Sequence, residues 1–192
     1  MPDRNQAALD FLLTRRSRPA KTLGTPVPDR AELELILTAA ARTPDHGKLE
    51  PWRFIVLEKV ALTRLAGMIP DRATALNIAP DKIDKAIGQY RDADLAIAVI
   101  ETPVPSDKVP MIEQTYSAGA VCLSLLNAAL AAGWGANWLS GWASHDSEFC
   151  RLGLGLNADE RIAGLIHIGT ETKTPPERPR PNLNQKVTWV SE

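Results

Sequence analysis

The stretch Met111–Gly141 constrains the fold more than any other part of the sequence. Over residues 118–132, only one glycine, one serine and one asparagine interrupt the apolar and alanine residues, and residues 114–144 contain no charge. A surface helix of a globular protein carries charged or polar residues on its outer face. We therefore expect a helix that is covered on nearly every side. After Gly133, a residue that commonly ends helices, we expect an aromatic-rich strand or loop at Trp134–Ser140.

Ala120, Ser124 and Ala128 recur at every fourth position of this helix. The spacing puts them on one face, where their small size lets another helix or a second copy of the chain approach closely. The helix is shorter than a membrane span and carries polar residues. It could be the core helix of a single chain. We expect the core of a dimer instead, because a chain of 192 residues has little other mass to cover it.

The charge balance excludes some classes of function. Lysine and arginine together number 22, and aspartate and glutamate number 23, which argues against binding nucleic acid or a membrane through bulk charge. Cys122 and Cys150 do not make a disulfide framework, and we expect Cys122 to be a small core residue. The N-terminus lacks an apolar signal region. We therefore expect a cytoplasmic protein in which residues 1–192 form one domain.

Hydrophobic periodicity predicts about six helices and four or five strands in an α+β order. Besides the central helix, we expect helices at 4–14, 29–42, 59–69, 80–90 and 147–152. We expect strands at 52–58, 94–101, 161–169 and 186–190, and irregular structure at 21–28, 43–51, 70–79 and 102–110. Residues 170–184 hold four prolines and predict an extended arm. A strand pattern at its end suggests that the C-terminus pairs with something distant, such as a partner subunit's sheet.

The sequence offers little protein-only chemistry. Gly153–Ala158 matches the letters of the dinucleotide fingerprint G-x-G-x-x-G/A, but a helix precedes it and a strand follows, which is the reverse of that motif. The three histidines, His46, His145 and His167, have no spacing that suggests a zinc site, and we expect no metal. His167 lies in an apolar strand, where we expect a hydrogen-bonded sheet residue. An enzymatic activity would therefore depend on a cofactor.

The arginines that could bind a ligand fall at three separate places in the chain. Their forked, permanently charged side chains suit phosphate oxygens, although arginine at a helix C-terminus also simply complements the helix dipole. Together with the aromatic-rich stretch 134–142, these clusters would suit a planar phosphorylated ligand. The residues concerned are Arg15 and Arg16 with the adjacent Ser17, then Arg42, and then Arg178 and Arg180.

Four segments carry a resemblance to a known family: RRSRP, ARTPDHGKLEPWRFIVL, SAGAVCLSLLNAALAAGWGANWLSG and LGLNADERIAGLIHIG. In their order and spacing the chain resembles the nitroreductase family of FMN-dependent NAD(P)H oxidoreductases, and most of all its short bacterial subfamily. The resemblance implies a mostly antiparallel sheet flanked by helices. It also implies an intertwined homodimer in which both chains build each of two FMN sites and residues 171–192 embrace the partner.

The resemblance also implies roles for particular residues. Arg15, Arg16 and Ser17 would hold the phosphate, ribityl chain and pyrimidine edge of FMN, and Arg42 and His46 would reach FMN from the other subunit. Trp138, Leu139 and Ser140 would lie against the isoalloxazine, and Arg178 and Arg180 would bind phosphate. No catalytic side chain is implied. Lys48 and Glu50 depart from the family, because neutral amides are common in this loop.

The implied activity is ping-pong reduction of nitroaromatic compounds, quinones or similar small electrophiles by NADH or NADPH. Three alternatives stay open. The same flavin fold supports other reactions, such as dehalogenation or dehydrogenation. A second alternative is a non-catalytic flavin carrier, and a third is a structural dimer without cofactor. The sequence does not distinguish NADH from NADPH, and it does not identify the physiological substrate.

Overall fold

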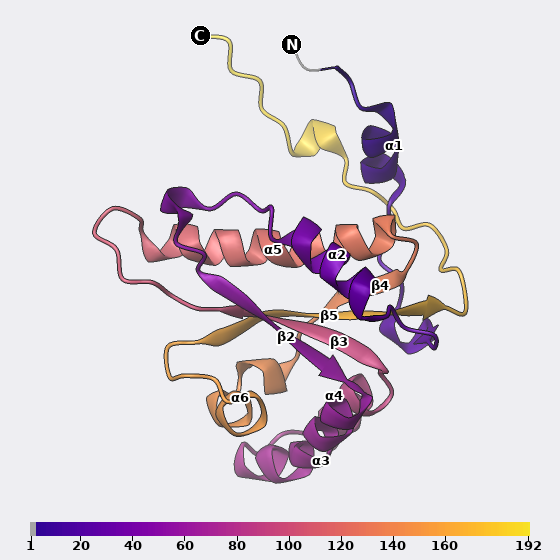
Figure 1. Ribbon diagram of the computed structural model, residues 1–192, viewed down its shortest axis with the longest axis vertical. Helices are drawn as coiled ribbons and strands as arrows, with labels where there is room; N and C mark the ends of the chain where they lie inside the picture. The colour runs from indigo at the N-terminus through magenta and orange to yellow at the C-terminus, as the bar shows by residue number, and fades with distance from the viewer. Residues whose placement is uncertain (1–2) are drawn as a thin grey trace.

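The computed structural model describes residues 3–192 and has the expected α+β architecture, with one antiparallel sheet between two helical layers (Figure 1). The sheet order is β1-β5-β3-β2, with β4 also paired to β5, and all four pairings are antiparallel. The strands are β1 Leu23–Gly24, β2 Trp52–Glu58, β3 Leu95–Glu101, β4 Gly135–Leu139 and β5 Arg161–Glu171.

Two groups of helices cover the two faces of the sheet (Figure 1). One face packs against α2 and α5, and the other packs against α3, α4 and α6. The helix α1 projects away from the body beside the C-terminal arm. The helices are α1 Gln6–Thr14, α2 Arg30–Ala40, α3 Lys59–Ala75, α4 Pro80–Arg91, α5 Met111–Ala131 and α6 Ser147–Leu154, with short 3-10 turns at 20–22, 46–48, 142–145 and 183–185.

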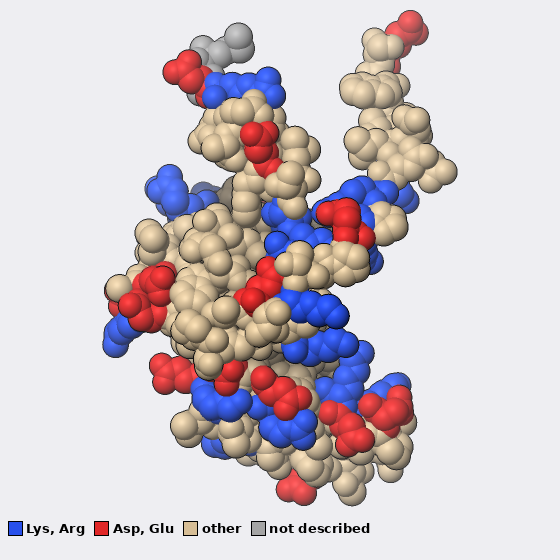
Figure 2. Space-filling model, turned by 90° about the vertical axis from the view of Figure 1, so that its right-hand side faces the viewer, with Lys and Arg blue, Asp and Glu red and all other residues tan. Residues whose placement is uncertain are grey.

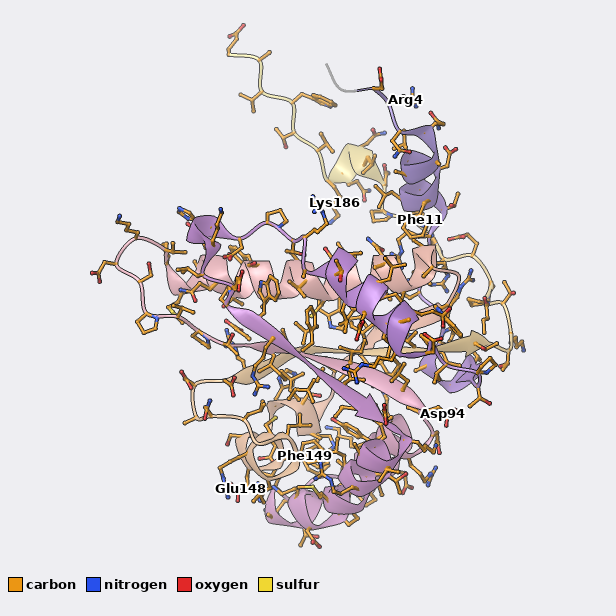
Figure 3. The ribbon with its side chains drawn as sticks, in the orientation of Figure 1. Arg4, Phe11, Asp94, Glu148, Phe149 and Lys186 are labelled. Atoms are coloured by element: carbon orange, nitrogen blue, oxygen red, sulfur yellow. The ribbon has the colours of Figure 1, made fainter. Side chains whose placement is uncertain are left out.

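The alternation of side chains along β3 builds both halves of the core. Ile97 and Val99 face α2 and α5, whereas Ala96 and Ala98 face α3, α4 and α6. Because every residue of β3 is buried, its continuous apolar sequence is what a strand covered on both faces requires. In the lower layer Phe149 packs against Tyr90 with ring centroids 5.5 Å apart (Figure 3).

The central helix is buried on one side only. Val121, Cys122 and Leu125 are fully buried against the sheet, but an apolar stripe that includes Tyr116 (67% exposed) and Leu123 (46% exposed) faces outward. The expectation of cover on nearly every side is therefore not met within one chain. The face of α5 that carries Ala120, Ser124 and Ala128 packs partly against α2 of the same chain.

That packing is visible in one hydrogen bond and one helix contact. Ser124 accepts a hydrogen bond of 2.8 Å from the hydroxyl of Thr43, just beyond α2. Ala128 packs against the cluster that contains Ile36 of α2. The close approach predicted for the ridge of small residues thus occurs between α5 and α2 of the same chain.

Two predicted boundaries are wrong for physical reasons. The helix expected to end at residue 69 continues through Pro70 to Ala75, so residues 70–75 are not irregular. Ile69 and Ala73 are buried one turn apart, and packing of this face outweighs the hydrogen bond that a proline removes. In the loop expected at 21–28, two residues form β1 against the end of β5.

The strand expected at 186–190 is absent from the described chain, where Lys186 closes a turn and residues 187–190 have no strand partner. Trp189 is 91% exposed, and Val190 is also largely exposed. A strand needs a neighbouring backbone and a surface to cover its apolar side chains. One chain offers neither at this position. Over residues 3–192, no helix is long and apolar enough to cross a membrane.

An ion pair fastens α3 to α6. The guanidinium of Arg72 donates to the carboxylate of Asp146 at 2.6 and 3.0 Å, and Asp146 also accepts from the backbone N–H of Phe149, which caps α6. The hydrogen bond from Arg72 holds the pKa of Asp146 below its ordinary value. Asp146 therefore joins a helix cap to an interhelical contact.

Replacing Asp146 with alanine should lower the free energy of unfolding by about 2 kcal/mol at neutral pH, because the cap is lost and Arg72 is left unpaired. A carboxyl whose folded-state pKa is depressed stabilises fully above its unfolded pKa of about 3.9 and loses this effect as the pH falls through the folded value. The difference between wild type and D146A in urea unfolding should therefore hold from pH 7 to 5 and shrink below about pH 4.

The matched control is Glu148→Ala in the same first turn of α6, where the side chain pairs at the surface with Arg151. This change should alter stability little, since exposed pairs contribute little. Equal destabilisation by D146A and E148A would contradict the assigned role of Asp146.

Candidate functional site

The segment that follows α1 is fastened to the outer edge of β4. Helix α1 begins at its cap Asn5 and ends at Thr14, after which Arg15 leaves helical geometry. The backbone N–H of Arg18 donates to the carbonyl of Ala136 at 2.8 Å. The side-chain amide of Asn137 donates to the carbonyl of Arg18 at 2.7 Å. The arginine segment therefore has a fixed position beside the sheet.

Three basic side chains meet at this segment, together with one hydroxyl. Arg15 donates to the hydroxyl of Ser17 at 3.1 Å. The C-terminal arm returns here, because Arg16 donates to the carbonyl of Pro176 at 3.2 Å and Arg180 donates to the carbonyl of Arg15 at 3.5 Å. The structure thus brings together two clusters that are separated by more than 160 positions in the sequence.

The environment of Arg15 is unusual for a cation. Its Nε is buried with no hydrogen-bond partner. Burial, followed by the positive charges of Arg180 and Arg16, lowers the pKa of Arg15 from its ordinary value. A half-buried cation with an unused buried donor and two cationic neighbours is stabilised by an anion.

Carboxylates are also present near this cluster. Glu171 pairs with Arg18 at 3.4 Å, and Glu177 pairs with Arg180 at 2.8 Å. Arg178 is exposed on the same stretch of arm. Figure 2 shows basic side chains gathered at the base of the two projecting segments. A cavity of about 330 Å³ opens here, and its walls include Phe11, Arg15, Arg16 and Trp134; Phe11 is labelled on α1 in Figure 3.

The end of β4 contributes to both faces of the sheet. The indole of Trp138 lies over Gly164 of β5, near the sulfur of Cys122, on the α5 side. Leu139 and Ser140 line a second cavity of about 330 Å³ that extends toward α4. Since successive side chains of a strand point to opposite faces, the predicted trio Trp138, Leu139 and Ser140 does not form a single surface.

His46 lies far from the arginine cluster within one chain, whereas Arg42 adjoins Thr43, which bonds to Ser124 in the second half of α5. His46 pairs through Nδ1 with the carboxylate of Glu113 at 2.7 Å, in the first turn of α5, and Arg42 is exposed just beyond α2. The arginine cavity includes Leu130, in the last turn of the same helix. A helix of 21 residues is about 31 Å long, so His46 and the arginine cavity sit at opposite ends of α5.

The loop before β2 has an uncommon backbone. Gly47, Lys48 and Glu50 have positive φ values of 76°, 54° and 50°, a region that is costly for residues with a Cβ. The Asp45 carboxylate accepts from the backbone N–H of Glu50 at 2.7 Å and closes the loop. Lys48 and Glu50, the two departures noted in the sequence, are therefore both held in left-handed conformations.

Several residues that shape the site were not found from the sequence. Asn137 and Glu113 position predicted residues through hydrogen bonds, and an asparagine inside an apolar strand was the available signal for the first. The expectation that His167 is hydrogen-bonded is wrong for its side chain, because its Nε2 is buried without a partner. No cluster of metal-ligating side chains occurs among residues 3–192.

A model of the nitroreductase family matches residues 12–170 of this chain. The chain belongs to the nitroreductase family. The protein named "Putative NAD(P)H nitroreductase YdjA" from Escherichia coli K12 is 36% identical over 163 residues, which cover 85% of this chain and 87% of that protein. The chain is therefore an oxidoreductase by family, as the resemblance implied.

Solved structures of the family confirm the fold. A nitroreductase-like family protein from Bacillus cereus matches with a TM-score of 0.79 at 20% identity, covering 99% of this chain and 98% of the other. A nitroreductase with bound FMN from Bacteroides fragilis matches with a TM-score of 0.73 at 19% identity, covering 98% and 100%. At these identities the likeness concerns the fold alone.

Replacing Gly164 with alanine should destabilise the protein by about 1–3 kcal/mol, because the new Cβ would overlap the indole Nε1 of Trp138 and approach the Cys122 sulfur. The indole must then move outward, so quenching of tryptophan fluorescence by acrylamide should increase. Gly67→Ala in α3 is the control, because a Cβ there meets nothing within 4 Å. An unchanged unfolding midpoint for G164A would contradict the close packing of Trp138.

Proposed function

We propose that this protein is an FMN-dependent oxidoreductase that takes electrons from NADH or NADPH and passes them to small electrophiles such as nitroaromatic compounds or quinones. The observation that carries the proposal is the half-buried Arg15, whose Nε is buried and has no hydrogen-bond partner among residues 3–192, beside Arg16 and Arg180. The relative named as an NAD(P)H nitroreductase and the family structure that contains FMN support the same donor and cofactor.

The residues present fit FMN at both of its ends. Its phosphate is a dianion, and the unused donor of Arg15 lies in a cationic cavity beside Arg16 and Ser17. Arg180 reaches the same segment, and Arg178 adds charge on the same arm. The planar ring would occupy the cavity at the end of β4, with contacts from Leu139 and Ser140, while Trp138 lies on the other face of the sheet. Segment 15–21 connects the two cavities, since it lines both of them.

FMN supplies the hydride-transfer and electron-transfer chemistry when it is bound. The chain binds and orients it, with the permanent positive charge of Arg15 at the phosphate end. Donor and acceptor would use the same exposed face in turn, which gives ping-pong kinetics. We assign no side chain of this chain as a general acid or base.

We also propose a homodimer in which each site uses both chains. The apolar stripe of α5 with Tyr116 and Leu123 lacks cover in one chain. Two-fold contacts are isologous, so two α5 helices packed antiparallel would bring the start of one helix to the end of the other. This arrangement would carry Arg42 and His46 to the partner's arginine cavity.

The projecting segments support the same assembly. Helix α1 and the C-terminal arm extend from the side of the body on which α2 and α5 lie (Figure 1). Leu13 of α1 and Trp189 of the arm are among the most exposed apolar side chains. Apolar groups on extended segments are stabilised by burial, and a second copy seated on α5 would provide that cover for residues 171–192.

The purified protein should show flavin absorbance that bleaches when NADPH or NADH is added without air, and Arg15→Ala should bind FMN about 10- to 100-fold more weakly. The variant removes hydrogen bonds from a buried charged donor, which are among the stronger ones in proteins. Affinity can be measured by quenching of FMN fluorescence.

Arg30→Ala is the control, because this exposed arginine pairs only with Glu34 on the surface of α2. Full flavin occupancy and full NAD(P)H oxidation in R15A would refute the role of Arg15. Wild-type protein that stays colourless after FMN is added would refute the proposed function itself.

Replacing Leu123 with glutamate should convert the dimer to a monomer in sedimentation velocity and lower flavin occupancy with it, because a charge in the middle of an apolar interface has no partner. Val60→Glu is the matched control, since Val60 is equally apolar and highly exposed but lies on α3 at the opposite layer. A flavin-loaded monomer, in either wild type or L123E, would refute the shared site.

A further inference from the structure

The cavity at the end of β4 contains two buried polar groups that no other contact uses. Its walls combine Leu139 and Ser140 with Gln89 from α4 and His167 from β5. The Nε2 atoms of Gln89 and His167 are both buried without hydrogen-bond partners. Asp94, labelled in Figure 3, marks the neighbouring start of β3. Two orphan groups in one cavity indicate a ligand that bonds to both.

Both groups are neutral and fixed in place. His167 is 2% exposed, and burial lowers its pKa to about 4, so its ring carries one N–H and one free lone pair at neutral pH. The Gln89 amide nitrogen is a donor, and its oxygen lies near Gly141, the residue after Ser140. The pair therefore offers an acceptor or donor from histidine and a donor from glutamine.

The charged side chains that line this cavity lie at its solvent-exposed opening. Lys21 and Lys85 are exposed there, and neither forms an ion pair within the described chain. Asp92 also lies at the mouth, but its carboxylate is held by Arg91 at 2.7 Å. The interior of the cavity therefore carries uncharged hydrogen-bonding groups, and the positive charges of Lys21 and Lys85 lie at its opening.

We infer that Gln89 and His167 form the polar floor of the ring end of the cofactor site and hydrogen-bond the edge of the isoalloxazine that carries alternating C=O and N–H groups. This inference rests on the proposed FMN function and adds two residues to it. The chemistry matches, because carbonyl oxygens accept from the amide of Gln89 and a ring N–H can donate to the histidine lone pair. Their role is to position the ring rather than to transfer protons.

The decisive variant is Gln89→Met, which keeps the side-chain length and removes the donor. FMN binding should weaken about tenfold, since one hydrogen bond to a buried carbonyl is lost. The midpoint potential of the bound flavin should fall by about 30 mV, which is a further tenfold loss of preference for the reduced form. The reduced ring carries more negative charge and therefore depends more on the donor.

Lys82→Met is the matched control on the same helix, because its side chain is exposed and does not line the cavity. It should leave both the affinity and the potential unchanged. An unchanged affinity and potential in Q89M would overturn the inference for Gln89. If Q89M still binds FMN and the flavin is reduced, the proposed function stands. If the wild-type protein does not bind FMN, the proposed function itself is refuted.

His167 is tested in the wild-type protein, because a change in the core could prevent folding. The ¹⁵N signals of its ring should shift when FMN is added, while those of His145 should not. A second void of about 10 Å³ beside His167 has room for roughly one water. If such a water is its partner, the His167 signals stay unchanged with FMN bound, and that outcome overturns the inference for His167.

Discussion

The antiparallel pairing of β4 with β5 fixes the position of nearly every candidate site residue. β4 has only five residues, yet both of its edges are used, by β5 on one side and by the segment around Arg18 on the other. The start of β4 opens onto the arginine cavity, and its end opens onto the cavity floored by Gln89 and His167. A shift of one residue in this register would exchange the two faces.

The two cavities differ in the way they use burial. At the arginine cavity, partial burial removes water from the permanent charge of Arg15. A bound anion would compensate for the hydration free energy that this charge loses. At the end of β4, burial keeps His167 neutral. The unpartnered Nε2 atoms of His167 and Gln89 can then hydrogen-bond to an uncharged edge of a ligand. A ligand with a charged end and a polar, uncharged end is the one that satisfies both. Such a ligand also stabilises the fold by mass action, because the unfolded chain lacks the site.

Much of the fold could be predicted from the sequence because local patterns agree with the tertiary structure. The apolar residues 95–100 of β3 and the uncharged residues 114–131 of α5 can be buried in only one way in a layered fold, and the order of helices and strands was predicted from such patterns. Pro70 inside α3 and the unpaired segment 186–190 could not be predicted, because each depends on what packs against it. The arginine residues at 15, 16 and 180 could be nominated by type, but their meeting depends on the path of the arm. His167 could be noticed as a polar residue in an apolar strand, but nothing in the sequence joined it to Gln89, because an unsatisfied hydrogen-bonding group is a property of three-dimensional packing.

The length of α5 has a genetic consequence. Because Arg15 and His46 lie at opposite ends of one helix, a shared site in the proposed homodimer would draw one of these groups from each chain. Consider a mixed dimer in which one chain is altered at Arg15 and the other at His46. One of its two sites then carries both alterations, and the other carries none. Two chains that are each defective alone would together regain one intact site.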